Sequence, residues 1–227
     1  MNKKLPVLIL LYNFLMPSSV AQPNIILILA DDQGWNGLSA QMDPEYIGSK
    51  SDFYHTPYID WLASEGMRFS HGYAPAPVCS PTRHSIQFGM CPAKIRVTNN
   101  NAKNIQLCEP KQALANMIKK ADARYTTAHF GKWHVSLSPA ACGYDVSDGS
   151  LGNSDGNKAN NTEDPKRTFE VSKRAVSYMK KKVKANQPFF MQVSYFADHL
   201  KFMSSPKMEK KYKLLPPGAR HKDPVFA

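Results

Sequence analysis

The segment 78–83, Val-Cys-Ser-Pro-Thr-Arg, places a nucleophile and a cation beside a predicted helix start. Proline is tolerated in the first turn of a helix but not in its interior, so Pro81 predicts that a helix begins here. Cys79 then lies at the helix N-terminus, where free backbone N–H groups and the helix dipole favour an anion or a thiolate. Arg83, four residues later, falls on the same helix face. The segment predicts an anion site, although a buried cysteine in an ordinary helix start explains Cys-x-Pro-x-Arg alone equally well.

Two adjacent carboxylates, Asp31 and Asp32, follow an almost unbroken apolar run at residues 24–30. A continuous run, rather than an alternating one, is typical of a central parallel strand that is covered on both faces. The carboxylates would then lie at the C-terminal end of the strand, where open α/β sheets place their ligand sites. Neighbouring carboxylates repel each other unless a cation holds them, and oxygen ligands suit calcium or magnesium. An acidic turn made by Asp-Asp-Gln-Gly is the alternative interpretation.

Lys132 and His134 form a second candidate pair, directly after a predicted strand at residues 126–130. They alternate with Trp133, so in an extended chain both side chains point the same way. A lysine and a histidine at a strand end suit an anionic oxygen and a proton transfer. A further histidine, His199, follows Asp198 at the end of a predicted core strand, residues 188–196. A satisfied structural histidine is an equally good interpretation of His199 by itself.

Four motifs of this chain resemble those of the formylglycine-dependent sulfatases, a family within the alkaline-phosphatase-like group. They are the apolar run with its acidic end at residues 23–35, His-Thr-Pro at 55–57, Cys-Ser-Pro-Thr-Arg at 79–83 and Gly-Lys-Trp-His at 131–134. The similarity runs from about Pro23 to the last residue. It implies an α/β fold with a mostly parallel central sheet that is flanked by helices on both faces.

The resemblance also implies that Cys79 is oxidised after translation to formylglycine, with a formylglycine-generating enzyme as partner. One departure lies close by, because Phe88 stands where the family usually has a threonine before the glycine, here Gly89. That position bears on recognition by the modifying enzyme. The activity implied is hydrolysis of sulfate esters, those of carbohydrates in particular, with a sulfated glycan as the substrate.

Carried over position by position, the resemblance gives each candidate residue a role. The expected catalytic residues are Cys79, Arg83, Lys132, His134 and His199, and the expected ligands of one calcium ion are Asp31, Asp32 and modified Cys79. Arg83 orients the nucleophile, and Lys132 neutralises the sulfate oxygens. His199 donates a proton to the leaving alcohol, and His134 takes the proton that allows sulfate to leave.

Residues 200–227 lack features that the family carries beyond this histidine. Sulfatases of this kind take two further metal ligands, an Asp-Asn or Asp-His pair after another strand, and a further lysine. We therefore expect residues 22–227 to be the N-terminal part of a sulfatase catalytic domain, crippled or inactive alone. Two other hypotheses stay open: a phosphatase or phosphonate hydrolase of the same superfamily, and a secreted basic protein that binds polyanions without turnover.

The composition limits the classes of partner that the chain would attract. The chain of 227 residues has 29 Lys and Arg against 18 Asp and Glu, a formal charge of +11, and would attract polyanions. Nucleic acid is not the expected partner, because the charge is dispersed or gathered in the lysine-rich run 180–184, which is typical of a solvated helix face. We find no zinc-finger spacing or RNP-like motif.

Residues 1–21 have the layout of a secretory signal peptide. Lys3 and Lys4 precede a mostly apolar run at residues 5–16, and Ser-Val-Ala at 19–21 forms a small-residue cleavage site. The run is too short to span a bilayer as a helix, and no later segment approaches that length. We therefore expect a chain that is exported, to the periplasm or the outside, with no membrane span.

The remaining predictions concern elements and cysteines. Helices are predicted from Pro57, with Thr56 as N-cap, and at residues 81–88, 111–121 and 165–185; a short strand is predicted at 69–73 and a loop at 143–161. In the helix at 165–185, Phe169, Val176, Met179 and Val183 are expected to face inward. Of the cysteines besides Cys79, Cys91 could pair with Cys108, and free structural cysteines are an equal alternative.

Overall fold

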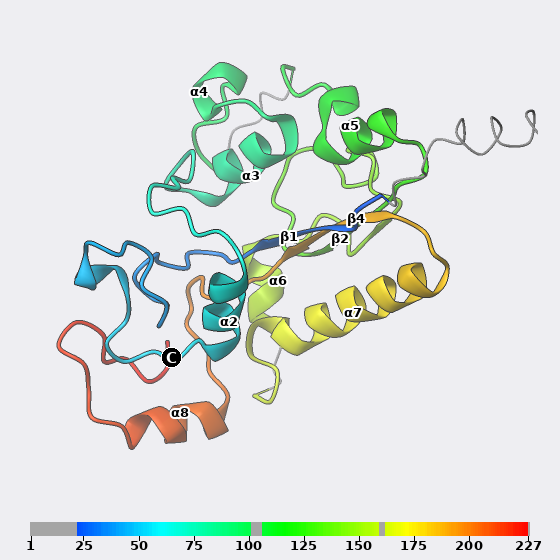
Figure 1. Cartoon of the computed structure of the whole chain (residues 1–227). Helices are drawn as coiled ribbons and strands as arrows, with labels where there is room; N and C mark the ends of the chain where they lie inside the picture. The colour runs from blue at the N-terminus through cyan, green and yellow to red at the C-terminus, as the bar shows by residue number, and fades with distance from the viewer. Residues whose placement is uncertain (1–21, 101–105, 159–161, 227) are drawn as a thin grey trace, which may run out of the picture.

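The computed structural model describes residues 22–100, 106–158 and 162–226. Its centre is a four-stranded parallel sheet in the order β1-β4-β2-β3, built from β1 (Ile25–Leu29), β2 (Thr126–Gly131), β3 (Val146–Ser147) and β4 (Phe189–Ser194). Helices α3 (Cys79–Phe88) and α5 (Leu114–Ala121) cover one face of the sheet, and α7 (Thr168–Lys184) covers the other (Figure 1). The predicted fold class, a parallel α/β sheet between helices, is confirmed.

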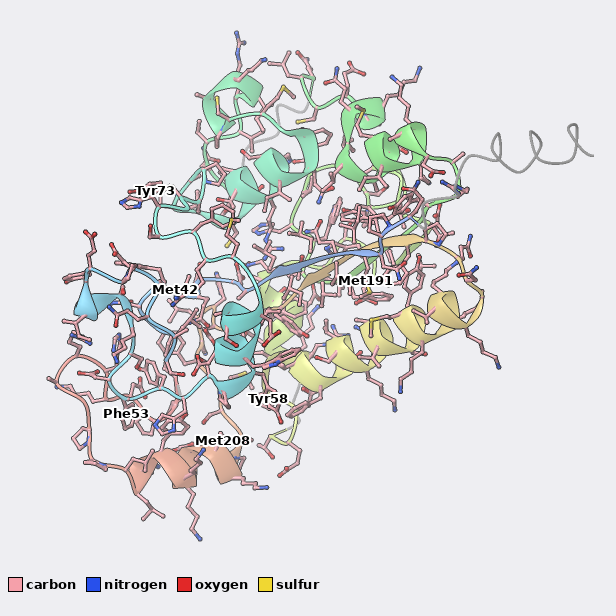
Figure 2. The ribbon with its side chains drawn as sticks, viewed as in Figure 1. Met42, Phe53, Tyr58, Tyr73, Met191 and Met208 are labelled. Carbon is pink, nitrogen blue, oxygen red and sulfur yellow. The ribbon has the colours of Figure 1, made fainter. Side chains whose placement is uncertain are left out.

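Each face of the sheet packs against its own hydrophobic cluster. All residues of β4 are buried, because this strand has a neighbour on each side and helices above and below. Figure 2 shows Met191 between the sheet and α7, where it belongs to the cluster on that face. On the α3 and α5 face, the cluster includes Phe88, Trp133, Tyr144 and Phe190.

Helix α7 turns a different face to the sheet from the one expected. Val171, Ala175 and Tyr178 are buried, whereas Phe169 and Val183 are 63% and 58% exposed, so the expectation of an inward Phe169, Val176 and Val183 was wrong. The short side chains of Val171 and Ala175 allow α7 to approach the strands closely. A Cβ added at Gly131 of β2 would already lie 3.4 Å from Val171.

Strand β1 was expected to be central and covered on both faces, and this was wrong. Within the described residues it pairs only with β4 and forms an edge of the sheet. Ile26 and Ile28 are 43% and 59% exposed, while Leu27 packs against the cluster beneath α3. The apolar run did predict the strand and its parallel pairing, but it does not reveal how many neighbours the strand has.

The other elements follow the predictions in part. Helix α2 (Pro57–Glu65) begins as predicted, but it has no buried residue, and Tyr58 is 87% exposed at its start (Figure 2). Residues 69–73 form no strand, and the predicted loop at 143–161 contains both β3 and the short helix α6 (Asn153–Asn157). The remaining elements are η1 (Ile47–Ser49), α4 (Pro92–Ile95), η2 (Pro110–Gln112), η3 (Pro165–Arg167) and α8 (Pro206–Lys213).

Three further expectations concern the cysteines, a membrane span and the signal peptide. All four cysteines are free, and Cys91 is exposed while Cys108 is buried, so the bridge considered between them does not form. Among the described residues, no helix has the length and apolar character needed to cross a bilayer. The predicted signal peptide at 1–21 lies outside the described residues, as do residues 101–105 and 159–161.

A buried chain of polar side chains ties α3 to the centre of the sheet. The amide of Gln87 donates to Gln192 Oε1 at 2.8 Å, and the Tyr144 hydroxyl donates to the same oxygen at 2.9 Å. Gln192 Nε2 in turn donates to Ser194 Oγ at 3.1 Å, and that oxygen lies 3.2 Å from Nε2 of His129. Burial, and then the charge of Arg83, lower the pKa of His129 to about 3, so the histidine is neutral.

We predict that Gln192→Leu destabilises the protein by about 1–3 kcal/mol, because it leaves the buried amide of Gln87 without its acceptor. Urea unfolding should show a lower midpoint with an unchanged slope. The matched control, Gln112→Leu at an exposed position, should change the free energy of unfolding by less than about 0.5 kcal/mol. Equal stability of the two variants would contradict a structural role for this chain of hydrogen bonds.

Candidate functional site

The candidate residues converge at the C-terminal edge of the sheet. Asp31 follows β1, Lys132 follows β2 and His199 follows β4, while the N-terminus of α3 brings Cys79 to the same edge (Figure 1). This is the edge at which parallel α/β sheets bind ligands. The predicted position of the site is thus where the strand ends and the motif helix meet.

Helix α3 begins at Cys79, two residues before the predicted start, and Val78 before it is extended. Cys79 and Arg83 lie on the face that meets the end of β1. The Cys79 Sγ lies 3.6 Å from Asp31 Oδ1, and the Arg83 Nη2 lies 3.3 Å from the same oxygen. The spacing of four residues therefore does bring the thiol and the guanidinium together, as predicted.

Asp31 is 5% exposed and holds the two buried cations of the site. Its second oxygen accepts a hydrogen bond from the ammonium of Lys132, and the Arg83 Nη1 donates to the Lys132 carbonyl at 2.6 Å. Burial by itself would raise the pKa of this carboxyl, but the Lys132 hydrogen bond and the Arg83 charge hold the pKa below its usual value. Asp31 is therefore ionised and paired.

The protonation of Cys79 differs from the expectation for a helix N-terminus. Burial raises the pKa of the Cys79 thiol, and this effect outweighs the nearby ammonium of Lys132, which lies 3.2 Å from Sγ. The negative charge of Asp31 acts in the same direction as burial. The raised pKa disfavours the thiolate that a helix N-terminus by itself would favour, so the unmodified residue is a weak nucleophile.

Lys132 and His134 reach the site, but not along an extended strand as predicted. His134 has a φ of 53°, and the N–H groups of Trp133 and His134 both donate to the Leu151 carbonyl. The chain therefore turns after Lys132, whose side chain is fully buried against Asp31. Burial, and then the charges of Lys132 and Arg83, lower the pKa of His134 to about 4, so this histidine is neutral and can accept a proton.

Asp32 and His199 form the open side of the site. The Asp32 carboxylate is 57% exposed, and its Oδ2 lies 3.9 Å from His199 Nε2. The backbone N–H of Asp198 donates to the Asp31 carbonyl, which fixes the segment after β4 against the end of β1. Burial, and then the charge of Asp32, raise the pKa of Asp198 to about 6.

The carboxylate oxygens of Asp31 and Asp32 suit an oxygen-preferring cation, whereas the thiol of unmodified Cys79 and the imidazole of His199 are softer donors. A cavity of about 230 Å³ opens beside Asp31, Asp32 and Cys79. Ligand atoms of Asp31, Cys79 and His199 lie within 4.8 Å of one another, close enough to share one ion. Two carboxylates at one cavity fit calcium or magnesium. The ligand set of Asp31, Asp32 and modified Cys79 stays a prediction.

Two residues at the site were not singled out from the sequence. Gln33 lines the same cavity and offers an amide oxygen, and its position directly after the acidic pair is a signal that sequence reading could use. Lys166 is only 3% exposed, and its ammonium is close enough to Asp31, Lys132 and Asp198 to interact with their charges. In the sequence, Lys166 follows Pro165 at the start of a predicted helix, and nothing in that pattern indicates a functional residue.

Comparisons with known proteins agree with this geometry. Residues 23–220 match the sulfatase family. Arylsulfatase G of Rattus norvegicus is 37% identical over 130 residues, 55% of this chain and 23% of the relative. N-acetylgalactosamine-6-sulfatase of Sus scrofa is 33% identical over 127 residues, 52% of this chain and 22% of the relative. The structure of Ps i-CgsB in complex with k-i-k-neocarrahexaose has a TM-score of 0.66 at 23% identity, over 90% of this chain and 51% of that one.

The chain thus spans less than a quarter of the curated relatives that it matches and about half of the solved structure. The family match runs through the acidic end of β1, the motif helix α3 and both histidine segments. Because the match covers most of the chain and includes the residues that meet at the sheet edge, this chain belongs to the sulfatase family.

Proposed function

We propose that this chain carries the sulfate-transfer site of a sulfuric ester hydrolase that acts on sulfate esters of carbohydrates. The observation that carries the proposal is the buried group around Asp31, in which Cys79, Arg83 and Lys132 all contact one carboxylate. Two fixed cations beside the motif cysteine match the charge of a sulfate group. The names of the relatives, a galactosamine sulfatase among them, support a saccharide substrate.

The proposal includes conversion of Cys79 to formylglycine. The hydrated aldehyde supplies an oxygen nucleophile toward sulfur and a second hydroxyl for the release of sulfate. Arg83 and Lys132 stabilise the negative charge of the sulfate oxygens and are already in place, because Asp31 fixes both. The raised pKa of the thiol supports a modified residue as the nucleophile rather than the cysteine itself.

Two histidines complete the proposed chemistry. His199 stands on the open side, where the leaving alcohol would emerge, and donates a proton to the alcohol oxygen. Burial lowers the pKa of His134 to about 4, so the ring is neutral and has an unprotonated nitrogen. We assign it the proton that residue 79 gives up when sulfate leaves. Calcium, held by Asp31, Asp32 and the modified residue 79, would supply positive charge beside the nucleophilic oxygen.

Two alternatives to a sulfate ester hydrolase can be distinguished by experiment. A phosphatase or phosphonate hydrolase would use the same cations, because phosphate and sulfate present similar oxygens. A secreted polyanion-binding protein without turnover would use the charge of +11 alone. The placement of Cys79 against Arg83 and Lys132 favours the hydrolase, because non-specific polyanion binding requires no buried cations.

We also propose export, to the periplasm or outside the cell. The signal-like pattern of residues 1–21 supports it, with cleavage after Ala21. Formylglycine formation on an exported chain would require the modifying enzyme in the same pathway. N-terminal sequencing of the exported product should begin at Gln22, and retention of Met1 in exported protein would contradict the proposed cleavage.

We predict that Cys79 is converted to formylglycine when the chain is produced with a formylglycine-generating enzyme. Tryptic mass spectrometry should detect the aldehyde at position 79, while exposed Cys91 stays alkylatable and serves as the internal control. Because this chain is expected to be crippled or inactive alone, the whole modified protein that contains it is then assayed on a saccharide sulfate and on phosphate and phosphonate monoesters. Sulfate release is expected; turnover of the phosphorus esters alone, or an unmodified Cys79, would refute the proposal.

Calcium should bind at the acidic pair. We expect this chain alone to bind calcium weakly or not at all, because it offers only part of a calcium shell. In the whole modified protein we predict that Asp32→Asn weakens calcium binding on the order of tenfold or more, because it removes one anionic ligand. Asp32 is chosen because it is exposed, whereas Asp31 also holds Arg83 and Lys132. Glu65→Gln, at an exposed site on α2, is the matched control. Calorimetry that finds equal calcium affinity in both variants would rule out Asp32 as a ligand.

His199 should matter most for poor leaving groups. In the whole protein that contains this chain, we predict that His199→Ala lowers kcat for a sugar sulfate by roughly a hundredfold or more, the usual effect of losing a general acid. Hydrolysis of a nitrophenyl sulfate should fall much less, because that alcohol leaves without protonation. His71→Ala, an exposed histidine elsewhere, should leave both rates unchanged. Equal losses for both esters would assign His199 to binding or structure instead.

A further inference from the structure

Two adjoining cavities lie beside the sulfate site, against the segment that follows β4. The smaller, of about 70 Å³, is lined by Lys166, Asp198 and Met203, and the larger, of about 300 Å³, by Asn36, Tyr54, His221 and Asp223. Phe202 and Phe226 line both cavities. The two cavities therefore share an aromatic wall, and together we call them the aromatic groove.

The aromatic groove begins where the proposed leaving group would emerge. Asp198, in its wall, precedes His199 and bonds through its backbone to the carbonyl of Asp31. Asn36, at the other end, lies four residues after Asp32. The groove thus runs along the loop that follows β1, and its near end adjoins the histidine assigned to the leaving alcohol.

Aromatic rings form the floor of the groove. Phe202 and Phe226 meet edge to face with ring centres 5.2 Å apart. The ring centre of Tyr54 lies 5.1 Å from that of Phe226. His221 packs on Tyr54 at 5.2 Å and is held by Asp52. Phe202 remains 42% exposed, so part of its apolar ring is accessible from the solvent.

Lys166 is built into the wall rather than extended into solvent. It is 3% exposed, and its ammonium donates to Asn157 Oδ1 at 2.6 Å. An ammonium has three donors, and among the described residues no acceptor is found for the other two. Lys166 and Arg167 also have left-handed backbones, with φ of 57° and 55°, a strain that is typical of functional segments.

We propose that the aromatic groove is a saccharide-binding subsite that holds the sugar ring next to the sulfated one. The inference rests on the proposed function and adds where the glycan lies. A sugar ring has an apolar face, which suits Phe202 and Phe226, and hydroxyl edges, which both donate and accept hydrogen bonds. Lys166 donates, while Asp198 and Asp223 accept. The two carboxylates would repel a second free anion, so a ring with hydroxyls fits better than another sulfate.

The test uses calorimetry at physiological salt with two probes, a neocarrahexaose and inorganic sulfate. Phe202→Ala and Lys166→Met should each lower the affinity for the hexasaccharide roughly tenfold, a loss that corresponds to one good contact. Phe202→Ala should bind inorganic sulfate as the unaltered chain does. Lys166→Met removes a charge near Asp31 and Lys132, so it should lose some affinity for sulfate but clearly more for the hexasaccharide. The matched controls are Phe169→Ala, an exposed aromatic on α7, and Lys158→Met, an exposed lysine near Lys166, and neither should change either affinity.

The outcomes separate this inference from the proposed function. If Arg83→Gln abolishes sulfate binding but the hexasaccharide binds no more tightly than sulfate, the sulfate site stands and the groove is overturned. Equal loss of both ligands in Phe202→Ala and Lys166→Met would show general structural damage and also overturn the groove. Failure of the unaltered chain to bind either probe would overturn the sulfate site, and the subsite with it.

Discussion

The buried carboxylate of Asp31 between Arg83 and Lys132 is the interaction on which the site depends. It joins the end of β1, the motif helix α3 and the end of β2, which are far apart in the sequence. Removing Asp31 would leave two buried cations without their carboxylate, at a penalty on the order of 3–5 kcal/mol. The ion group therefore fixes three segments relative to one another, and Cys79 is held in contact with two of its members.

Helix α3 is anchored on the sheet at a second point, one turn beyond Arg83. Gln87 bonds to Gln192 and Tyr144, so neutral hydrogen bonds continue what the ionic contacts begin. Both anchors lie on the face that meets the sheet, because residues four apart share a helix face. A helix held at Arg83 and at Gln87 cannot rotate without breaking buried polar contacts. Cys79 is thereby positioned in part by Gln87 and its partners, which take no part in the proposed chemistry.

Local pattern in the sequence was enough to predict the strand before Asp31, the helix at Cys79 and the meeting of Cys79 with Arg83. It failed where tertiary contacts decide. The apolar run of β1 was read as central, yet Ile28 is 59% exposed at a sheet edge. His134 was placed by strand alternation, but its left-handed backbone turns the chain at that point. Lys166 gave no sequence signal, because its importance comes from burial beside charges that are distant in the chain.

Burial decides which nucleophile the site can use. A thiolate at position 79 would have to carry its charge beside Asp31 in a partly buried setting, and the raised pKa of the thiol reflects that penalty. An aldehyde hydrate is uncharged, so burial does not oppose its presence in the same place. Under the proposed function, the positive charge of Arg83 and Lys132 would then be available to the sulfate oxygens. The environment that makes the cysteine a weak nucleophile is thus compatible with a neutral oxygen nucleophile and an anionic substrate.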